Sequence, residues 1–385
     1  MTTATCPSKV TLFFECLANT ADLDERDNRG KKHSLALVLT GLVLALCCGR
    51  DGKLSRLHRH MVHHFPALQQ ATATRQQRVI SRAQLPRVLA KVNVEVFARL
   101  LNEWFGFSLD SHQQAWFALD GKELRGSIAA DNRRGEACVS ALIQETGLII
   151  SQLYYSGSKD SEQPAVRQLI TQAGLAGKKL TLDALHCSPA TLTTIHQQGG
   201  NFLVGLKSNQ PVLYRYAICH TLMQQPVYHR QDAAQRGHGR QQERTYACFR
   251  VNVSHLNLRW QACGLCTLIS VKRVRRKLDG SHPAEEISYF LSNYGVQSQQ
   301  QADELFDAIR GHWHVEVMHY QRDVTLREDS LRSSNNTLSR TMSGLRTLVY
   351  NLLKRTMAKN MAAKIDQFAD DFNSLIEFMT QYRVL

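Results

Sequence analysis

The chain contains 385 residues, of which 43% are hydrophobic and 21% are charged. This composition excludes an intrinsically disordered protein, and the length predicts two or three folding units. Lys and Arg number 47 against 33 Asp and Glu, and the net charge of +14 indicates a polyanionic partner, most often nucleic acid. A basic protein of unrelated function is the alternative that charge alone leaves open.

The longest apolar segment, residues 34–48, predicts a buried helix. It has 15 residues, fewer than the roughly 20 that a bilayer-spanning helix needs. Met1 leads into polar residues, so we expect neither a secretory signal nor a membrane partner. We expect a cytoplasmic, nucleoid-associated protein with reduced cysteines.

One pair of cysteines and one group of histidines contain residue types that bind metals, but neither has the spacing that would identify a metal site. Cys263 and Cys266 form a C-x-x-C pair without the second pair that a structural zinc site needs. Four histidines follow the apolar segment, and we interpret them as a solvated or phosphate-facing helix surface rather than a metal site: His58, His60, His63 and His64.

The predicted elements change in type along the chain. Residues 1–115 are expected to be helical, with Ser81 as a candidate cap of a helix over 84–92. The next part predicts an α/β unit with a mixed sheet, with strands at 116–119, 138–144, 148–154, 179–183 and 202–206 and helices at 162–173 and 190–197. The pattern then predicts a β-rich region over 211–300, with strands at 246–253, 266–274 and 287–291 and a turn at Asp279-Gly280, followed by helices.

Three acids occur where an α/β fold often places metal ligands. Asp120 follows the first predicted strand, Asp183 ends the fourth, and Glu316 lies on a predicted helix. Loops at one edge of such a sheet converge, and carboxylates there can hold Mg²⁺ or Mn²⁺ for phosphodiester chemistry. A strand-end Asp is also a common turn or cap residue, so spacing alone predicts only a basic α/β protein with a candidate carboxylate metal site.

The predicted helix around Glu316 has two stripes. We expect one stripe to face a cleft, and its members are polar: His312, Glu316, His319 and Asp323. We expect the other to be buried against the sheet, and its members are apolar: Phe306, Ile309, Trp313, Tyr320 and Val324. For Trp313, stacking on an unpaired base is the alternative to core packing.

Several motifs follow one another along nearly the whole chain. They are F-A-L-D-G-K-E-L-R-G-S (117–127), L-T-L-D-A-L-H (180–186), G-G-N-F-L-V-G-L-K-S-N-Q (199–210), G-H-G-R-Q-Q-E-R (237–244), I-R-G-H-W-H-V-E (309–316) and H-Y-Q-R-D-V-T-L-R-E-D-S-L-R (319–332). In this order they resemble the DDE transposases of bacterial insertion sequences, specifically the H-repeat-associated group. The segment D-N-R-G-K-K-H-S-L-A (27–36) is similar to that family's N-terminal associated domain.

The resemblance implies a fold and a metal site. The fold is an RNase H-like core over 116–210 and 301–385, a β-rich insertion over 211–300 and an N-terminal helical DNA-binding domain over 1–115. The first acid sits on strand one, the second on strand four and the third on a later helix. Asp120 would bridge two Mg²⁺ or Mn²⁺ ions, and Asp183 and Glu316 would each complete one site.

The resemblance also implies an activity and a partner. The activity is metal-dependent cleavage of insertion-sequence ends by water, followed by transfer of the freed 3′-hydroxyl into target DNA. The partner is double-stranded DNA, bound by a homodimer. Lys207 and Asn209 would lie near the DNA, with ordinary polar loop residues as the alternative, and the candidate basic contacts are Arg240, Arg244, Lys272, Arg273, Arg275, Arg276 and Arg310.

The chain departs from the family pattern close to the third acid. Val317, His319-Tyr320 and Arg322 stand where the family usually has Asn, a His-Trp pair and Leu, and a related subgroup would have other residues at Asp307 and Asp323. These departures leave the three acids in place. Because of these departures, the alternative interpretation is a transposase-derived protein that binds DNA without cutting it.

The positive charge is unevenly distributed. Residues 1–115 carry +6 and residues 211–300 carry +7, whereas 116–210 and 301–385 carry +1 and zero. The distribution predicts that the N-terminal region and the insertion hold DNA around a nearly neutral core.

Overall fold

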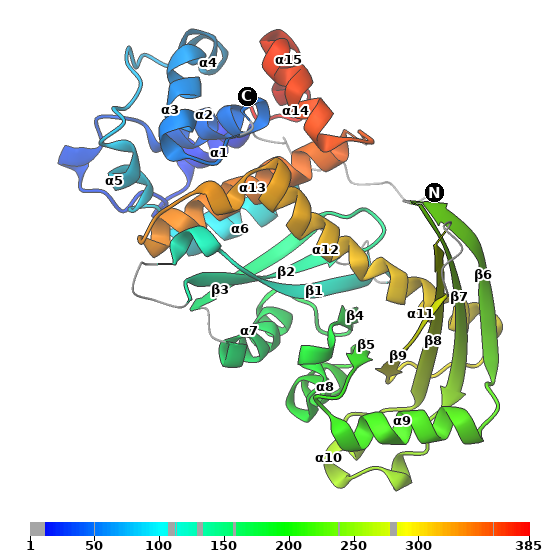
Figure 1. Cartoon of the computed structure of the whole chain (residues 1–385). Coiled ribbons are helices and arrows are strands. Elements are labelled where there is room, and N and C mark those ends of the chain that lie inside the picture. The colour runs from blue at the N-terminus through cyan, green and yellow to red at the C-terminus, as the bar shows by residue number, and fades with distance from the viewer. Residues whose placement is uncertain are drawn as a thin grey trace, which may run out of the picture.

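A mixed β-sheet forms the centre of the molecule. The computed structural model describes residues 12–49, 51–106, 112, 114–128, 134–156, 159–237, 239–277, 283–356 and 358–385. Its strands are β1 (Trp116–Glu123), β2 (Glu136–Ile143), β3 (Ile149–Ser156), β4 (Lys179–Leu182), β5 (Asn201–Leu206), β6 (Tyr228–Gly237), β7 (Arg240–Arg250), β8 (Thr267–Lys277) and β9 (Ala284–Ser292). Within the described residues they form one nine-stranded sheet in the order β3-β2-β1-β4-β5-β9-β8-β7-β6 (Figure 1).

The first five strands have the RNase H-like arrangement that the resemblance implies. β1, β2 and β3 are antiparallel neighbours, whereas β1, β4 and β5 run parallel. The strands expected in this part of the chain are therefore confirmed. β1 is longer than expected, because its pairing with β2 continues to Glu123, so Asp120 lies inside the strand and not directly after it.

Helices cover both faces of this core (Figure 1). α7 (Lys159–Gln172) and α8 (Pro189–Gln197) pack on one face through an apolar core that includes Phe117, Val166 and Leu192. The opposite face is covered by α6 (Val94–Phe105), α12 (Trp313–Tyr320) and α13 (Asn336–Arg355), which belong to a second apolar core. The sheet is thus the middle of three layers.

The region over 211–300 extends the same sheet. β9 pairs with β5, so four strands are added to the edge of the core, together with α9 (Pro211–Met223) and α10 (Leu258–Gln261). α11 (Gln299–Gly311) packs against these strands through a third apolar cluster. β6 and α9 were not expected from the sequence; β6 is largely exposed and polar, so it lacks the apolar alternation that predicts a strand. The expected turn at Asp279-Gly280 lies outside the described residues.

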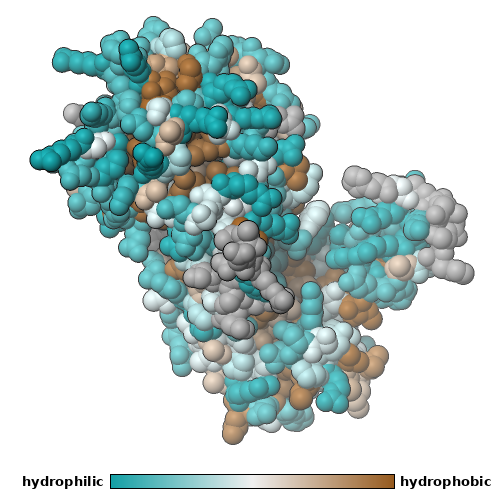
Figure 2. Space-filling view, turned by 60° about the vertical axis from the view of Figure 1, so that its left-hand side comes forward, coloured by the Kyte–Doolittle hydropathy of each residue, from teal (hydrophilic) through white to brown (hydrophobic). Residues whose placement is uncertain are grey.

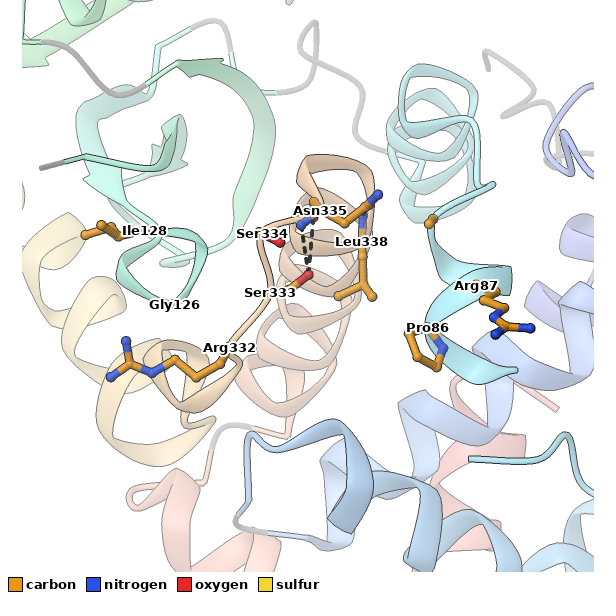
Figure 3. Close-up of a pocket in the computed structure, with 10 residues that line it drawn as sticks. Pro86, Arg87, Gly126, Ile128, Arg332, Ser333, Ser334, Asn335 and Leu338 are labelled. Atoms are coloured by element: carbon orange, nitrogen blue, oxygen red, sulfur yellow. Dashed lines mark hydrogen bonds between the residues drawn. The ribbon is translucent and has the colours of Figure 1, made fainter. Parts of the chain in front are cut away.

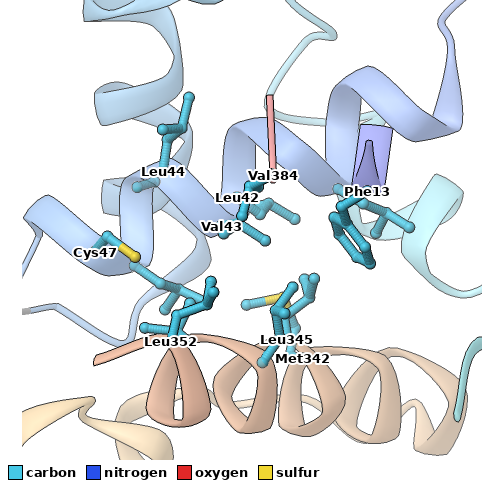
Figure 4. Close-up of a cluster of buried hydrophobic side chains, with 14 of the residues drawn as sticks. Phe13, Leu42, Val43, Leu44, Cys47, Met342, Leu345, Leu352 and Val384 are labelled. Atoms are coloured by element: carbon cyan, nitrogen blue, oxygen red, sulfur yellow. The ribbon is translucent and has the colours of Figure 1, made fainter. Parts of the chain in front are cut away.

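The N-terminal helices share a core with the C-terminal ones. The apolar segment forms α2 (Leu35–Cys48), and all of its residues are buried, as predicted. A helix that is apolar on every side is stable in water only when other elements pack against it on every side. Figure 4 shows α13 lying along α2, with Leu345 and Leu352 directed toward Val43 and Cys47.

The remaining helices complete this cover. They are α1 (Phe13–Asn19), α3 (Leu54–His63), α4 (Phe65–Thr72), α5 (Leu85–Leu89), α14 (Met361–Asp370) and α15 (Phe372–Gln381). α5 is shorter than the predicted helix over 84–92. Among the described residues, no helix combines the length and the apolar character that crossing a membrane requires.

Candidate active site

Strand register places Asp120 and Asp183 side by side. β1 and β4 are parallel, and their last paired residues are Leu119 and Leu182. The next residue of each segment is an acid, so the two carboxylates project from adjacent positions. Burial raises the pKa of Asp183; His186 opposes this rise, and the negative charge of Asp120 adds to it. The two acids therefore belong to one electrostatic cluster.

Each of these two acids also has a partner within the protein. Burial works to raise the pKa of Asp120, but its interaction with His319 outweighs burial and the pKa lies below its usual value. His319 Nε2 lies 3.3 Å from Asp120 Oδ2. Asp183 Oδ1 accepts a hydrogen bond from the Leu185 backbone at 2.9 Å and caps the short 3-10 turn Ala184–His186. The interpretation of Asp183 as a cap residue is thus correct, and the same side chain also interacts with the charge of Asp120.

Glu316 joins the cluster through His312. The His312 ring is partly buried, and its Nδ1 lies 2.9 Å from the Thr181 hydroxyl of β4. Burial lowers the pKa of His312, while the negative charges of all three acids, Asp120, Asp183 and Glu316, act in the opposite direction. The charges of all three carboxylates thus act on one imidazole, which indicates that the helix of Glu316 lies beside the strand ends of Asp120 and Asp183.

Three members of the polar stripe contact strands of the sheet, whereas we expected this stripe to face a cleft. Besides His312 and His319, Asp323 reaches β1, where its Oδ1 lies 2.6 Å from Lys122 Nζ. The side chain of Glu316 on α12 is exposed to solvent.

The apolar stripe was predicted wrongly beyond α11. Trp313 is 61% exposed and Tyr320 is 62% exposed, whereas Val315 and Met318 are the buried residues of α12. α11 ends at Gly311 and α12 begins at Trp313, and His312 between them keeps helical backbone angles of φ −57° and ψ −33°. Gly311 packs closely on Gln144.

Two residues near the acids were not singled out from the sequence. Glu162 of α7 accepts a hydrogen bond from the Tyr155 hydroxyl at 3.2 Å and lies 3.3 Å from His186 Nε2. Its carboxyl group packs on Gly121, where an added Cβ would stand 2.4 Å away. His186 is fully buried and lies 3.8 Å from Asp183 Oδ1. The only sequence signal was the position of His186 three residues after Asp183; Glu162 had none.

Three of the predicted DNA contacts form a cluster of arginines. Arg244 and Arg273 are cross-strand partners on β7 and β8, and Arg310 lies near the end of α11. Burial lowers the pKa of Arg244, and the like charges of Arg310 and Arg273 lower it further against the opposing effect of Tyr246. Arg310 also lies 3.3 Å from Asp232 Oδ2. We call Arg244, Arg273 and Arg310 the arginine cluster.

Strand register divides the other predicted contacts between two faces. Arg240 and Arg275 share the face of the arginine cluster, because side chains alternate along a strand. Lys272 and Arg276 lie on the opposite face, where they form ion pairs with Glu285 at 2.9 Å and Glu243 at 2.6 Å.

The two predicted loop residues after β5 differ in their contacts. Asn209 donates a hydrogen bond to the Ala184 carbonyl at 2.8 Å, so it braces the turn that follows Asp183. Lys207 is exposed where β5 ends.

A cleft of about 560 Å³ lies apart from the acid cluster. It opens between α5 and the start of α13 and includes Arg87, Gly126, Arg332 and Asn335 in its lining (Figure 3). None of the three acids lines it.

Comparison with known proteins defines the family. A family described as "Transposase DDE domain" matches residues 111–352, which is more than half of the chain and includes all three acids. The chain belongs to this family. The Escherichia coli K12 protein named "H repeat-associated putative transposase YhhI" is 25% identical over 301 residues, 76% of this chain and 78% of that protein. "Putative transposase YncI" of Escherichia coli O157:H7 is 26% identical over 283 residues, 70% of each chain.

A solved structure shows a weaker likeness. The piggyBac transposase, in a synaptic complex with hairpin DNA, has a TM-score of 0.49 and 10% identity, covering 96% of this chain and 78% of that one.

Proposed function

We propose that the chain is a metal-dependent DNA transposase that cleaves the ends of its own insertion sequence and joins the freed 3′-hydroxyl to target DNA. The observation that carries this proposal is that Asp120 and Asp183 lie side by side within a transposase DDE region, with Glu316 on a helix whose His312 is influenced by both acids. Asp120 and Asp183 are adjacent by strand register, and Glu316 shares the electrostatic environment of His312 with them.

The donor set of the acid cluster fits two Mg²⁺ or Mn²⁺ ions. Carboxylate oxygens are the ligands that these cations prefer. The pKa of Asp183 is raised by burial and by the charge of Asp120, so the cluster has unneutralised negative charge that cations would compensate. Asp120, Asp183 and Glu316 would hold these ions.

The protein's own residues position the ligands and the DNA. Bound divalent ions supply an activated water or hydroxyl and stabilise charge at the phosphodiester. His319 holds the Asp120 carboxylate in its ionised form, and the backbone of Leu185 fixes the orientation of Asp183. Asn209 anchors the turn behind Asp183, which keeps the two acids in register.

The arginine cluster is the proposed phosphate contact. Arg310 lies in the last turn of α11, shortly before His312 and Glu316, and Arg244 and Arg273 lie on the α11 side of the sheet. Figure 2 shows the far ends of the added strands as a largely hydrophilic arm that stands out from the body. Guanidinium groups match phosphate oxygens in geometry, so this face is suited to guide a DNA strand toward the acids.

Two pairs of basic residues on β8 test this assignment. Arg273→Gln with Arg275→Gln is expected to weaken DNA binding and to reduce the slope of log affinity against log salt by about 1–2, because roughly 0.9 counterions are released per phosphate contact. Lys272→Gln with Arg276→Gln removes the same charge from the opposite face and is the matched control. Fluorescence anisotropy over a salt series measures both slopes, and equal reductions would show that the two faces do not differ in DNA contact.

A cleavage assay tests the proposed function. The full chain is incubated with Mg²⁺ and the DNA that flanks its own coding sequence, and strand-specific breaks with 3′-hydroxyl ends are expected. A triple variant, Asp120→Asn with Asp183→Asn and Glu316→Gln, is expected to bind this DNA without cutting it. Cutting by the triple variant would refute the assignment of the acids.

The same assay decides the alternative function. Binding without cutting by the unaltered chain, with either Mg²⁺ or Mn²⁺, would identify a transposase-derived DNA-binding protein. We further propose a homodimer on DNA, because two element ends must be processed together. Sizing of the protein–DNA complex by light scattering tests this stoichiometry.

A further inference from the structure

A second group of metal-ligating side chains lies far from the acids in the sequence. Cys48 ends α2, His60 lies on α3, and His64 follows the end of α3. One ligand atom from each of the three lies within 4.8 Å of the other two. Cys48 is buried and both histidines are half-buried, so this is not the solvated histidine surface that the sequence suggested. We call these three residues the Cys-His-His cluster.

The surrounding structure holds the cluster in shape. His60 packs on Gly49, where an added Cβ would stand 2.9 Å from His60 Nε2, so the absence of a side chain lets His60 approach the end of α2. The His64 ring stacks on Phe372 of α15, with ring centroids 3.7 Å apart and planes 6° from parallel. The cluster therefore lies where the N-terminal helices meet the C-terminal helix pair (Figure 1).

Burial lowers the pKa of both imidazoles, and the neutral ring is the form that binds metals. Burial, followed by the charge of His63, lowers the pKa of His60, although Asp51 acts in the opposite direction. Burial and the neighbouring charges of His63 and His60 lower the pKa of His64 to about 4. At neutral pH each ring thus has a free lone pair.

The separations are close to those of a tetrahedral zinc site. Zinc lies about 2.3 Å from a cysteine sulfur and about 2.0 Å from an imidazole nitrogen, which puts its ligands roughly 3.3–3.6 Å apart. Small side-chain movements bring atoms within 4.8 Å of one another to these distances. A thiol and two imidazoles are also the softer ligands that favour Zn²⁺ over the Mg²⁺ proposed for the carboxylates.

We propose that Cys48, His60 and His64 bind one Zn²⁺ ion, with water in the fourth position. Binding converts the Cys48 thiol to a thiolate and releases its proton to solvent. The ion joins α2 to α3, and through the ring stack of His64 on Phe372 it ties both helices to α15. The proposed zinc ion is separate from the proposed catalytic ions.

Metal analysis and cobalt substitution test this site. The full chain is purified without a histidine tag and carries Asp120→Asn, Asp183→Asn and Glu316→Gln, so that the acid cluster contributes little metal binding. One zinc per chain is expected after dialysis. Replacement by Co²⁺ is expected to produce a sulfur-to-cobalt charge-transfer band in the near ultraviolet, which oxygen ligands do not give. Because the acids are replaced, the result does not depend on the proposed transposase activity.

Neighbouring residues provide matched controls. Cys48→Ala is expected to abolish the charge-transfer band, and His64→Gln to weaken metal binding by roughly tenfold or more. Cys47→Ala and His63→Gln are expected to keep both signals, since Cys47 is directed toward Leu352 of α13 (Figure 4) and His63 is exposed. A chelator should lower the melting temperature of the parent but not of His64→Gln.

Two results would overturn the proposal. One is a cobalt-loaded parent without the charge-transfer band. The other is a band that Cys47→Ala removes as completely as Cys48→Ala does. If Cys48→Ala fails to fold, His60→Gln and His64→Gln decide the question, because these half-buried side chains are easier to replace.

Discussion

Replacing Asp120 by Asn is expected to lower the rate of DNA cleavage by roughly 10³-fold or more, and Asp183→Asn by a similar factor. An amide has nearly the shape of a carboxylate but lacks the charge that holds divalent cations. The two residues are adjacent in register, so each substitution removes charge from the same cluster. Single-turnover cleavage and DNA affinity are measured in parallel, and the affinity is expected to change little.

Glu162→Gln is the matched control for these two substitutions. Glu162 is also an acid close to β1, but its carboxylate already has Tyr155 and His186 as partners. It therefore acts through His186, as a positioning residue, and its loss is expected to cost about tenfold. The Mg²⁺ concentration that gives half the maximal rate should rise in this variant, which a purely structural role would not cause. A loss as large as that of Asp120→Asn, together with an active Asp183→Asn, would instead assign Glu162 as the second metal ligand.

Most strands of the RNase H-like core could be predicted, because each is marked by a sequence pattern within a few neighbouring residues. The strands that carry Asp120 and Asp183 are short apolar runs, and the polar stripe around Glu316 follows helical spacing. The placement of Asp120 inside β1 could not be predicted. It depends on pairing with β2 through Lys122 and Glu123, which are polar residues without a strand signal of their own.

The sequence-based predictions are wrong or incomplete where residues far apart in the chain pack against one another. Trp313 is exposed and Val315 is buried, although the apolar spacing of the sequence predicted Trp313 as the core residue. Likewise, the apolar segment of α2 predicted a buried helix but not its cover, which comes from α13, about 300 residues away. Tertiary contacts thus override local periodicity at these places.

Arg322 is a departure from the family pattern that the structure explains. Its side chain is fully buried, and its guanidinium group donates two hydrogen bonds to the Glu328 carboxylate, including one from Nε at 3.0 Å. It also donates to the Thr347 hydroxyl at 3.1 Å and the Ser343 carbonyl at 3.2 Å, both on α13. Lys122 of β1 lies 3.6 Å from the same carboxylate. Arg322 therefore supports the fold beside the acid cluster and does not replace any of its members.

Glu328→Gln is expected to destabilise the protein by about 3–5 kcal/mol, because it leaves the buried guanidinium group of Arg322 without its carboxylate partner and removes a negative charge that favours the charged form of the buried Arg346. Arg346 is also fully buried and donates to the Leu326 carbonyl at 3.2 Å. Urea unfolding measures the free energy. Glu136→Gln is the matched control: Glu136 is just as buried, but its partner Arg340 is partly exposed, so water can solvate the cation that remains.

The interaction of Glu328 with its positively charged neighbours should also make the stability of the fold depend on pH in the acid range. Burial works to raise the pKa of Glu328, but the positive charges of Arg322, Lys122 and Arg346 outweigh it and lower the pKa to about 2. A group with a lowered pKa stabilises the fold fully above its ordinary value near 4.3 and loses that effect as the pH falls toward the lowered one. The unaltered chain should thus lose stability between about pH 4.5 and pH 2, and Glu328→Gln should lose measurably less over that range. Equal acid sensitivity of the two proteins would mean that Arg322 and its neighbours do not hold Glu328 ionised, and the buried pair would then not account for the stability of this junction between β1 and α13.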